Sequence, residues 1–243
     1  MKRLLYSLGW LAALVPFLCI GIAHAAITNK SADETRQVSG FHAIENIGSI
    51  DLEITLGSSE SLKIIGNQEA IDLVETEVKN GVLVISIKKN NKNLFNNWRV
   101  QKNLLIQISA KSLDALTQRG SGDIVVKNQI QGDQLQVALI GSGDIELPVN
   151  VKKLSASIVG SGDIDIKGTA ESADITIQGS GDFDGSALKT RDSNAKVSGS
   201  GDISIYVSNT LNAHLSGSGD ISYSGNPKEV NKQKSGSGDI SGR

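Results

Sequence analysis

Seven copies of the tetrapeptide Gly-Ser-Gly-Asp recur at nearly even intervals through the second half of the chain. The intervals between successive aspartates are 21, 19, 19, 20, 18 and 19 residues, and the aspartates are Asp123, Asp144, Asp163, Asp182, Asp202, Asp220 and Asp239. An even period of this length indicates one structural unit that is repeated and stacked along an axis. The chain is therefore predicted to be a solenoid whose coils each contain about 19 residues.

The residues between the tetrapeptides alternate between apolar and polar, as in Asp163-Ile-Asp-Ile and again in residues 173–177 (ADITI). This alternation is typical of strands, and no segment has helical spacing. A propeller needs longer units, and a hexapeptide solenoid needs a six-residue apolar period. Because crossovers between parallel strands are overwhelmingly right-handed, we expect an all-β, right-handed parallel β-helix with two or three strands in each coil.

The tetrapeptide has the composition of a tight corner. Glycine allows positive φ, and the aspartate carboxylate can accept hydrogen bonds from backbone amides that the sheet leaves unpaired. The residue after each corner is apolar. Coils stacked about 4.8 Å apart would align these residues in one inward column, and they are Ile124, Ile145, Ile164, Phe183, Ile203, Ile221 and Ile240.

Residues 1–25 have the layout of a secretory signal peptide: Lys2 and Arg3, an apolar run, and the sequence Ala-His-Ala before the expected cleavage point. Leu18, just before Cys19, disfavours lipidation. Residues 26–243 are predicted to form a single β-solenoid domain. Within it, residues 26–110 would form irregular N-terminal coils, residues 111–221 the regular repeats, and residues 222–243 a C-terminal cap, since lysines replace inward apolar residues there.

The composition restricts where the protein acts and what it binds. Residues 26–243 contain no cysteine, so an exported form would be stable without disulfides, as in a bacterial periplasm or at the cell surface. The whole chain has 24 basic and 26 acidic residues and no long basic run, which argues against nucleic acid as a partner. No transmembrane segment is expected in the mature chain.

The seven corner aspartates are the first candidates for chemistry. Stacked carboxylates about 4.8 Å apart repel each other, and either backbone amides or bound calcium could offset that repulsion. We expect structural corners without a cofactor, because one carboxylate per coil is a sparse ligand set, and calcium is the alternative. Glu146 and Asp165, two residues beyond their corners, are interpreted as isolated outward acids.

The sequence contains no constellation that predicts a catalytic site. Paired acids beside a basic residue are not apparent, and two separated histidines, His42 and His214, form no metal set with cysteine in the mature chain. Exposed aromatic side chains are the usual contacts for sugars. Phe95 and Trp98, in a segment rich in Asn and Lys, are therefore the candidate ligand contacts.

Three segments near the N-terminus resemble the opening of the bacterial head GIN domain family: residues 37–44 (QVSGFHAI), 50–54 (IDLEI) and 75–83 (ETEVKNGVL). The Gly-Ser-Gly-Asp-Ile corners resemble the C-terminal half of the same family, so the likeness covers roughly residues 35–243. The resemblance implies an exported β-helical domain of envelope proteins, described as the head of autotransporter adhesins. It implies no catalytic residues.

The function expected from the sequence is a non-enzymatic, exported binding or structural module of the bacterial cell envelope, periplasmic or secreted to the surface. An envelope polysaccharide or a surface protein would be its partner. A polysaccharide-active enzyme of the pectate-lyase-like β-helix type is the alternative, and a calcium-stabilised surface module is the second alternative. An enzyme would show acids clustered across adjacent coils on one face.

Overall fold

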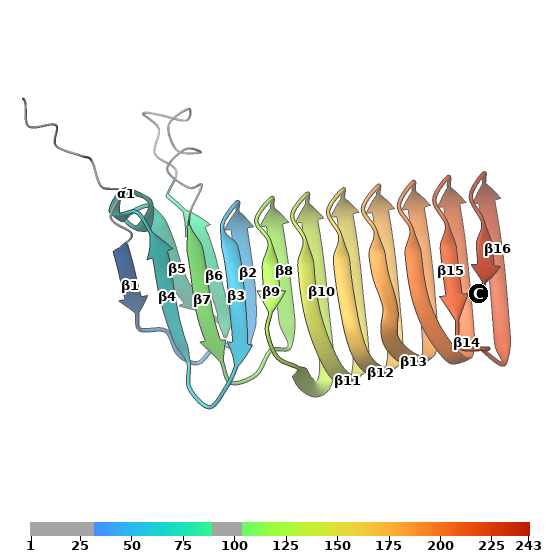
Figure 1. The fold of residues 1–243 in the computed structure, drawn as a ribbon, viewed down its shortest axis with the longest axis horizontal. Coiled ribbons are helices and arrows are strands. Elements are labelled where there is room, and N and C mark those ends of the chain that lie inside the picture. Colours follow the sequence, from blue (N-terminus) through green and yellow to red (C-terminus); the bar gives the residue numbers. More distant parts are fainter. Residues whose placement is uncertain (1–31, 89–103) are drawn as a thin grey trace, which may run out of the picture.

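The computed structural model describes residues 32–88 and 104–243, and these residues form the predicted β-solenoid (Figure 1). All 17 strands in the described part of the chain belong to one hydrogen-bonded sheet. The one helix among these residues, α1 (Gln68–Ile71), is a single turn capped by Asn67. No helix in the described part of the chain is long and apolar enough to cross a membrane. The sheet winds around a continuous apolar core.

The regular repeats form the long strands in the second half of the chain. Each coil runs along one face, passes a broad bend at one edge, returns on the other face and closes at a narrow corner at the opposite edge (Figure 1). The strands are β8 (Ala115–Gly120), β9 (Ile124–Val126), β10 (Ile130–Gly141), β11 (Ile145–Gly160), β12 (Ile164–Gly179), β13 (Phe183–Gly199), β14 (Ile203–Gly217), β15 (Ile221–Ser224), β16 (Glu229–Gly236) and β17 (Ile240–Gly242).

The apolar residue after each corner lies in the core, as predicted. Ile124, Ile145, Ile164, Phe183, Ile203 and Ile221 are each at most 1% exposed. Parallel pairing places each of them beside its equivalent in the next coil. Ile240 at the end of the column is only half-buried, because no further coil covers it. Burying one such side chain contributes about 1.5–3 kcal/mol, so this column is a major part of the hydrophobic stabilisation.

The corner glycines allow neighbouring coils to approach at backbone distance. Gly160 has φ +132°, and a Cβ there would lie 2.2 Å from the Gly141 carbonyl oxygen. A Cβ on Gly162 would lie 2.0 Å from the Gly143 oxygen. Between them, the Ser161 N–H donates to the Gly141 oxygen at 2.9 Å. Each Gly-Ser-Gly-Asp corner therefore requires two glycines. The first must adopt a positive φ and also leaves no room for a Cβ, whereas the second is required only because there is no room for a Cβ.

The N-terminal part combines parallel and antiparallel strands. Strand β2 pairs in parallel with β6 and β8, and β3 pairs in parallel with β7 and β9. The pairs β1–β4, β4–β7 and β5–β6 are antiparallel. These strands are β1 (Ala32–Arg36), β2 (Ala43–Gly48), β3 (Asp51–Leu56), β4 (Ser61–Gly66), β5 (Val74–Lys79), β6 (Val82–Ile87) and β7 (Leu105–Ala110).

The β5–β6 hairpin has a local cause in the sequence. Its turn is Asn80-Gly81, and both residues have positive φ, 51° and 79°. A two-residue turn with positive φ at both positions joins antiparallel strands with the twist that they require. Residues 69–78, which precede this turn, contain most of α1 and most of β5.

An eighth corner precedes the seven in the sequence. Gly48-Ser49-Ile50-Asp51 stacks directly on Gly120-Ser121-Gly122-Asp123, although 72 residues separate the two segments. Ile50 replaces the second glycine and is fully buried. In the coil stacked on it, a Cβ on Gly122 would lie 2.2 Å from the Ile50 oxygen, and a Cβ on Gly143 would lie 2.1 Å from the Gly122 oxygen. The restriction to glycine therefore falls on the later residue of each stacked pair.

The last coil continues the parallel stack but has a polar interior side. Strand β16 places Lys232 and Lys234 beside Ala213 and Leu215 of β14. The Lys234 Nζ lies 3.0 Å from the Asp239 carboxylate, and the Lys232 Nζ donates to the Ile240 carbonyl oxygen at 3.0 Å. Lysines on an edge strand disfavour pairing with another sheet, because adding a strand would bury their charge.

Replacing Gly162 by alanine is expected to destabilise the solenoid by more than about 2 kcal/mol, because two coils must separate locally to admit the Cβ. The measurement is urea unfolding followed by circular dichroism. Gly132→Ala is the matched control, since its Cβ would meet nothing closer than 3.9 Å. Equal midpoints for the two variants would contradict this account of the corner.

Candidate binding groove

The corner edge of the solenoid carries a ladder of aspartates. In every corner but the last, the carboxylate Oδ1 accepts the backbone N–H of the aspartate in the next coil, at 2.7–3.0 Å. The ladder begins at Asp51, whose corner lacks the second glycine of the tetrapeptide, and continues through the seven corner aspartates. Each N–H dipole lies between neighbouring carboxylates and offsets their repulsion. The carboxylates therefore have a structural role, because each bond links one corner to the next.

A second, shorter column of acids lies on the strands that follow the corners. Glu146 pairs with Asp165, and Asp165 pairs with Asp184, on three consecutive coils. The interpretation of Glu146 and Asp165 as isolated acids is therefore wrong, because register places them side by side. Partial burial raises the pKa of Asp165, and the charges of Asp184 and Glu146 raise it further. The Lys167 Nζ binds Glu146 at 2.9 Å.

The edge opposite the corners contains a groove that crosses the bends of five coils, with a volume of about 770 Å³. Buried Val151, Ala170 and Thr190, which pair in register, line its floor. A second column runs beside the floor, also in register, and its side chains are half-buried or exposed. This column consists of Gln131, Asn150, Thr169, Lys189 and Tyr206.

The outer side of the groove carries charges of alternating sign. Asp133, Lys152, Glu171 and Arg191 line it on successive coils, and Ser208 follows. The Lys152 Nζ binds the Asp133 carboxylate at 2.6 Å. This hydrogen bond and the opposite charge raise the pKa of Lys152 and lower that of Asp133. One end of the groove is therefore internally neutralised, whereas the other end carries Lys189 and Arg191.

A bulge shapes the end of the groove near Tyr206. The register between β13 and β14 shifts between Gly185 and Lys189, so that Lys189 comes to lie beside Tyr206. Within the bulge the Ser186 N–H donates to the Asp184 carboxylate at 2.9 Å. The uneven intervals of 20 and 18 residues around Asp202 are the sequence signal for this irregularity. Bulges are frequent beside functional sites, where they redirect side chains.

A hydrogen-bonded pair of hydroxyls lies beneath the same end. Thr190 and Ser193 are buried, and their Oγ atoms are 2.7 Å apart. The Thr190 hydroxyl donates to the Tyr206 carbonyl oxygen at 2.6 Å, and the Ser208 hydroxyl donates to the Thr190 carbonyl oxygen at 3.1 Å. These bonds fix the backbone of Tyr206 relative to the groove floor.

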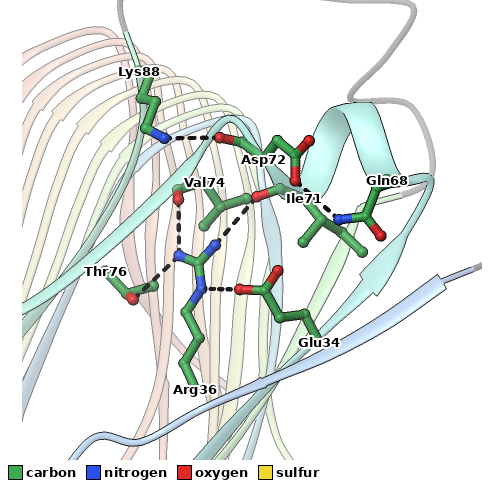
Figure 2. Close-up of polar contacts among 8 residues, drawn as sticks. All are labelled: Glu34, Arg36, Gln68, Ile71, Asp72, Val74, Thr76 and Lys88. Carbon is green, nitrogen blue, oxygen red and sulfur yellow. Dashed lines mark hydrogen bonds and ion pairs between the residues drawn. The ribbon is translucent and has the colours of Figure 1, made fainter.

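A second hollow lies at the N-terminal end of the solenoid and is lined by Arg36. The guanidinium N–H groups of Arg36 donate hydrogen bonds to residues of the same chain (Figure 2). Its guanidinium donates to the carbonyl oxygens of Val74 at 2.8 Å and Ile71 at 3.2 Å, and to the Thr76 hydroxyl at 3.3 Å. Its Nε binds Glu34 at 2.6 Å. Arg36 thus ties β1 to the end of α1 and to β5, which is a structural role.

The remaining sequence predictions concern two aromatic residues, the signal peptide and two histidines. Phe95 and Trp98, and the signal peptide of residues 1–25, lie outside the described residues. His42 faces Asp114 at 3.3 Å and His214 faces Gln233 at 3.2 Å, on separate parts of the surface. Within residues 32–88 and 104–243, no three His, Cys, Asp or Glu side chains are arranged to hold a metal ion.

The fold defines a parallel β-helical module with long polar surfaces and a groove across its bends. The family model described as "Putative auto-transporter adhesin, head GIN domain" matches residues 40–227, so the chain belongs to this family, as its sequence motifs indicated. A comparison with curated proteins finds no match.

Solved structures share the fold over most of this chain. A putative adhesin from Bacteroides fragilis is 26% identical with a TM-score of 0.81, and the match covers 89% of this chain and 98% of that one. A structure titled putative lipid binding protein, from Parabacteroides distasonis, is 24% identical with a TM-score of 0.71 and coverages of 89% and 98%. A putative adhesin from Parabacteroides merdae is 20% identical with a TM-score of 0.68 and coverages of 89% and 97%.

Calcium is expected to leave the thermal unfolding midpoint of residues 26–243 unchanged relative to a chelator, because backbone amides already satisfy the ladder carboxylates. The measurement is a calorimetric scan in each condition. A rise of more than a few degrees with calcium would show preferential binding to the folded state and would overturn the structural reading of the aspartates.

Asp165→Asn is expected to raise the unfolding midpoint at pH 7. The folded-state pKa of Asp165 lies above its ordinary value of 3.8, so its favourable contribution is present below that value and is lost as the pH rises through the folded pKa. The gain should therefore vanish in acid, which a series of melts between pH 3 and 7 would measure. Glu75→Gln, at an exposed carboxylate on β5, is the control, and a gain that persists at low pH would refute the argument.

Proposed function

We propose that this protein is an exported, non-enzymatic module of the bacterial cell envelope, and that it binds an envelope polysaccharide or a surface protein along its bend edge. Membership of the adhesin-head family supports the binding role. The predicted signal peptide supports export, to the periplasm or the cell surface. The even charge balance argues against nucleic acid as the partner.

The groove across five coils is the observation that carries this proposal. Its side chains offer hydroxyl, amide and charged groups to solvent at positions that the sheet register holds fixed. Preorganised polar groups bind with little loss of conformational entropy, which favours recognition of an extended partner. On the opposite edge the aspartate carboxylates are engaged by backbone amides, so they offer a partner fewer free groups.

The test is co-sedimentation of the purified protein with isolated bacterial envelopes. Thr169→Trp places a large side chain in the middle of the groove and should weaken binding by roughly tenfold or more, equivalent to about 1.4 kcal/mol. Ser155→Trp is the matched control, because Ser155 is exposed on a neighbouring coil and lies outside the groove. Absence of binding by the unmodified protein, or equal binding by both variants, would overturn the proposal.

The same samples test the enzyme alternative. The column Glu146, Asp165 and Asp184 meets the expectation that an enzyme clusters acids across adjacent coils. New reducing ends or unsaturated products, released from envelope polysaccharide by the protein and absent with Asp165→Asn, would overturn the non-enzymatic role. We expect no release.

A further inference from the structure

Two cationic side chains and one aromatic ring meet at the C-terminal end of the groove. Lys189 of β13 pairs in register with Tyr206 of β14, and Arg191 lies two residues beyond Lys189. All three line the groove. Acidic groups of the groove, Asp133 and Glu171, lie on earlier coils.

The two cations at this end remain available to a ligand. The Lys189 side chain is exposed and forms no ion pair or hydrogen bond within the described part of the chain. The Arg191 side chain is 71% exposed, and its contact with Asp192 is a 3.5 Å approach through Nε. The Asp192 carboxylate already accepts a 2.7 Å bond from Asn209. The terminal nitrogens of Arg191 can therefore bind a carboxylate in the bidentate geometry that guanidinium favours.

The position of Tyr206 is determined by its surroundings. Its backbone accepts the bond from Thr190, and its ring lies over Gly225, where a Cβ would stand 2.9 Å from the ring Cζ. Gly225 has φ +96° and also approaches the Val207 carbonyl, so glycine is required there for two reasons. The ring is half-buried and presents its remaining surface to the groove.

We propose that this end of the groove is a subsite for a carboxylated sugar of an acidic polysaccharide. Lys189 and Arg191 bind the carboxylate, and the ring of Tyr206 packs against the apolar face of the sugar. Thr169 and Asn150, whose side chains are joined by a 2.8 Å hydrogen bond, meet the hydroxyl groups of the preceding sugars. This inference rests on the proposed function, because it names the class of partner.

The lining of the groove favours a glycan over an acidic peptide. From Lys189 toward the N-terminal coils, the site is extended by hydroxyl and amide side chains on successive coils, which suit a partner with hydroxyl groups at a regular spacing. The apolar floor of Val151 and Ala170 is shallow and offers no deep pocket for a large apolar side chain. Charge complementarity at Lys189 and Arg191 then selects chains that carry carboxylates.

The test is isothermal titration of the whole protein with an oligogalacturonate and with a 1,4-linked galactan of the same length, which has a hydroxymethyl group in place of each carboxylate. We expect binding of the oligogalacturonate, and weakening by roughly tenfold or more both for the galactan and for the Lys189→Ala/Arg191→Ala variant. Tyr206→Ala should weaken binding as well, whereas Tyr206→Phe should retain it. Lys153→Ala/Lys196→Ala removes the same charge outside the groove and should bind normally.

Any of the following results would contradict the subsite, the choice of a glycan or the proposed function. No binding of the oligogalacturonate, or equal binding by the two double variants, would overturn the subsite. Equal affinity for polyglutamate would overturn the choice of a glycan. If the Lys189→Ala/Arg191→Ala variant still sediments with envelopes while Thr169→Trp does not, the subsite fails and the proposed function stands. If no variant and no unmodified protein binds envelopes, both fail.

Discussion

At the corners, neighbouring coils approach each other at backbone distance, and this contact controls how the coils stack. In the regular coils the serine N–H donates to a glycine oxygen of the preceding coil, and neither flanking glycine leaves room for a Cβ. This contact fixes the register of every coil at one edge. Because register is fixed there, the apolar column stays aligned in the core and each aspartate meets the amide of the next.

The corner edge and the bend edge of the solenoid therefore differ in how much their sequence and length can vary from coil to coil. The corner edge repeats almost without change from Gly48 to Asp239. The bend edge tolerates different lengths, as the bulge between β13 and β14 shows. Sequence variation at the bends leaves the corner contacts intact, so the rigid edge supports an edge that can be adapted to a ligand. Loops and bends on a rigid scaffold commonly carry function for this reason.

The two ends of the stack are closed by different means. At the N-terminal end, antiparallel strands and the Arg36 network cover the first coils (Figure 2). At the C-terminal end, Lys232 and Lys234 donate hydrogen bonds to oxygen atoms of the last coil, and this edge carries their positive charge. Both arrangements limit the growth of the sheet by addition of another strand, which an open parallel stack would otherwise favour.

The solenoid, the coil length, the inward column and the family could be predicted from the sequence alone, because each depends on a pattern local to one repeat. Alternation reports which side of a strand faces the core, and Gly-Ser-Gly-Asp reports where the chain turns. The pairing of Gly48–Asp51 with a corner 72 residues away, and the groove, emerged only from the fold. Neighbours in these features belong to different coils, and small differences in coil length change which side chains meet. Which side chains lie side by side across coils depends on the pairing register. Register is a relation between two coils, so the sequence of one repeat does not specify it.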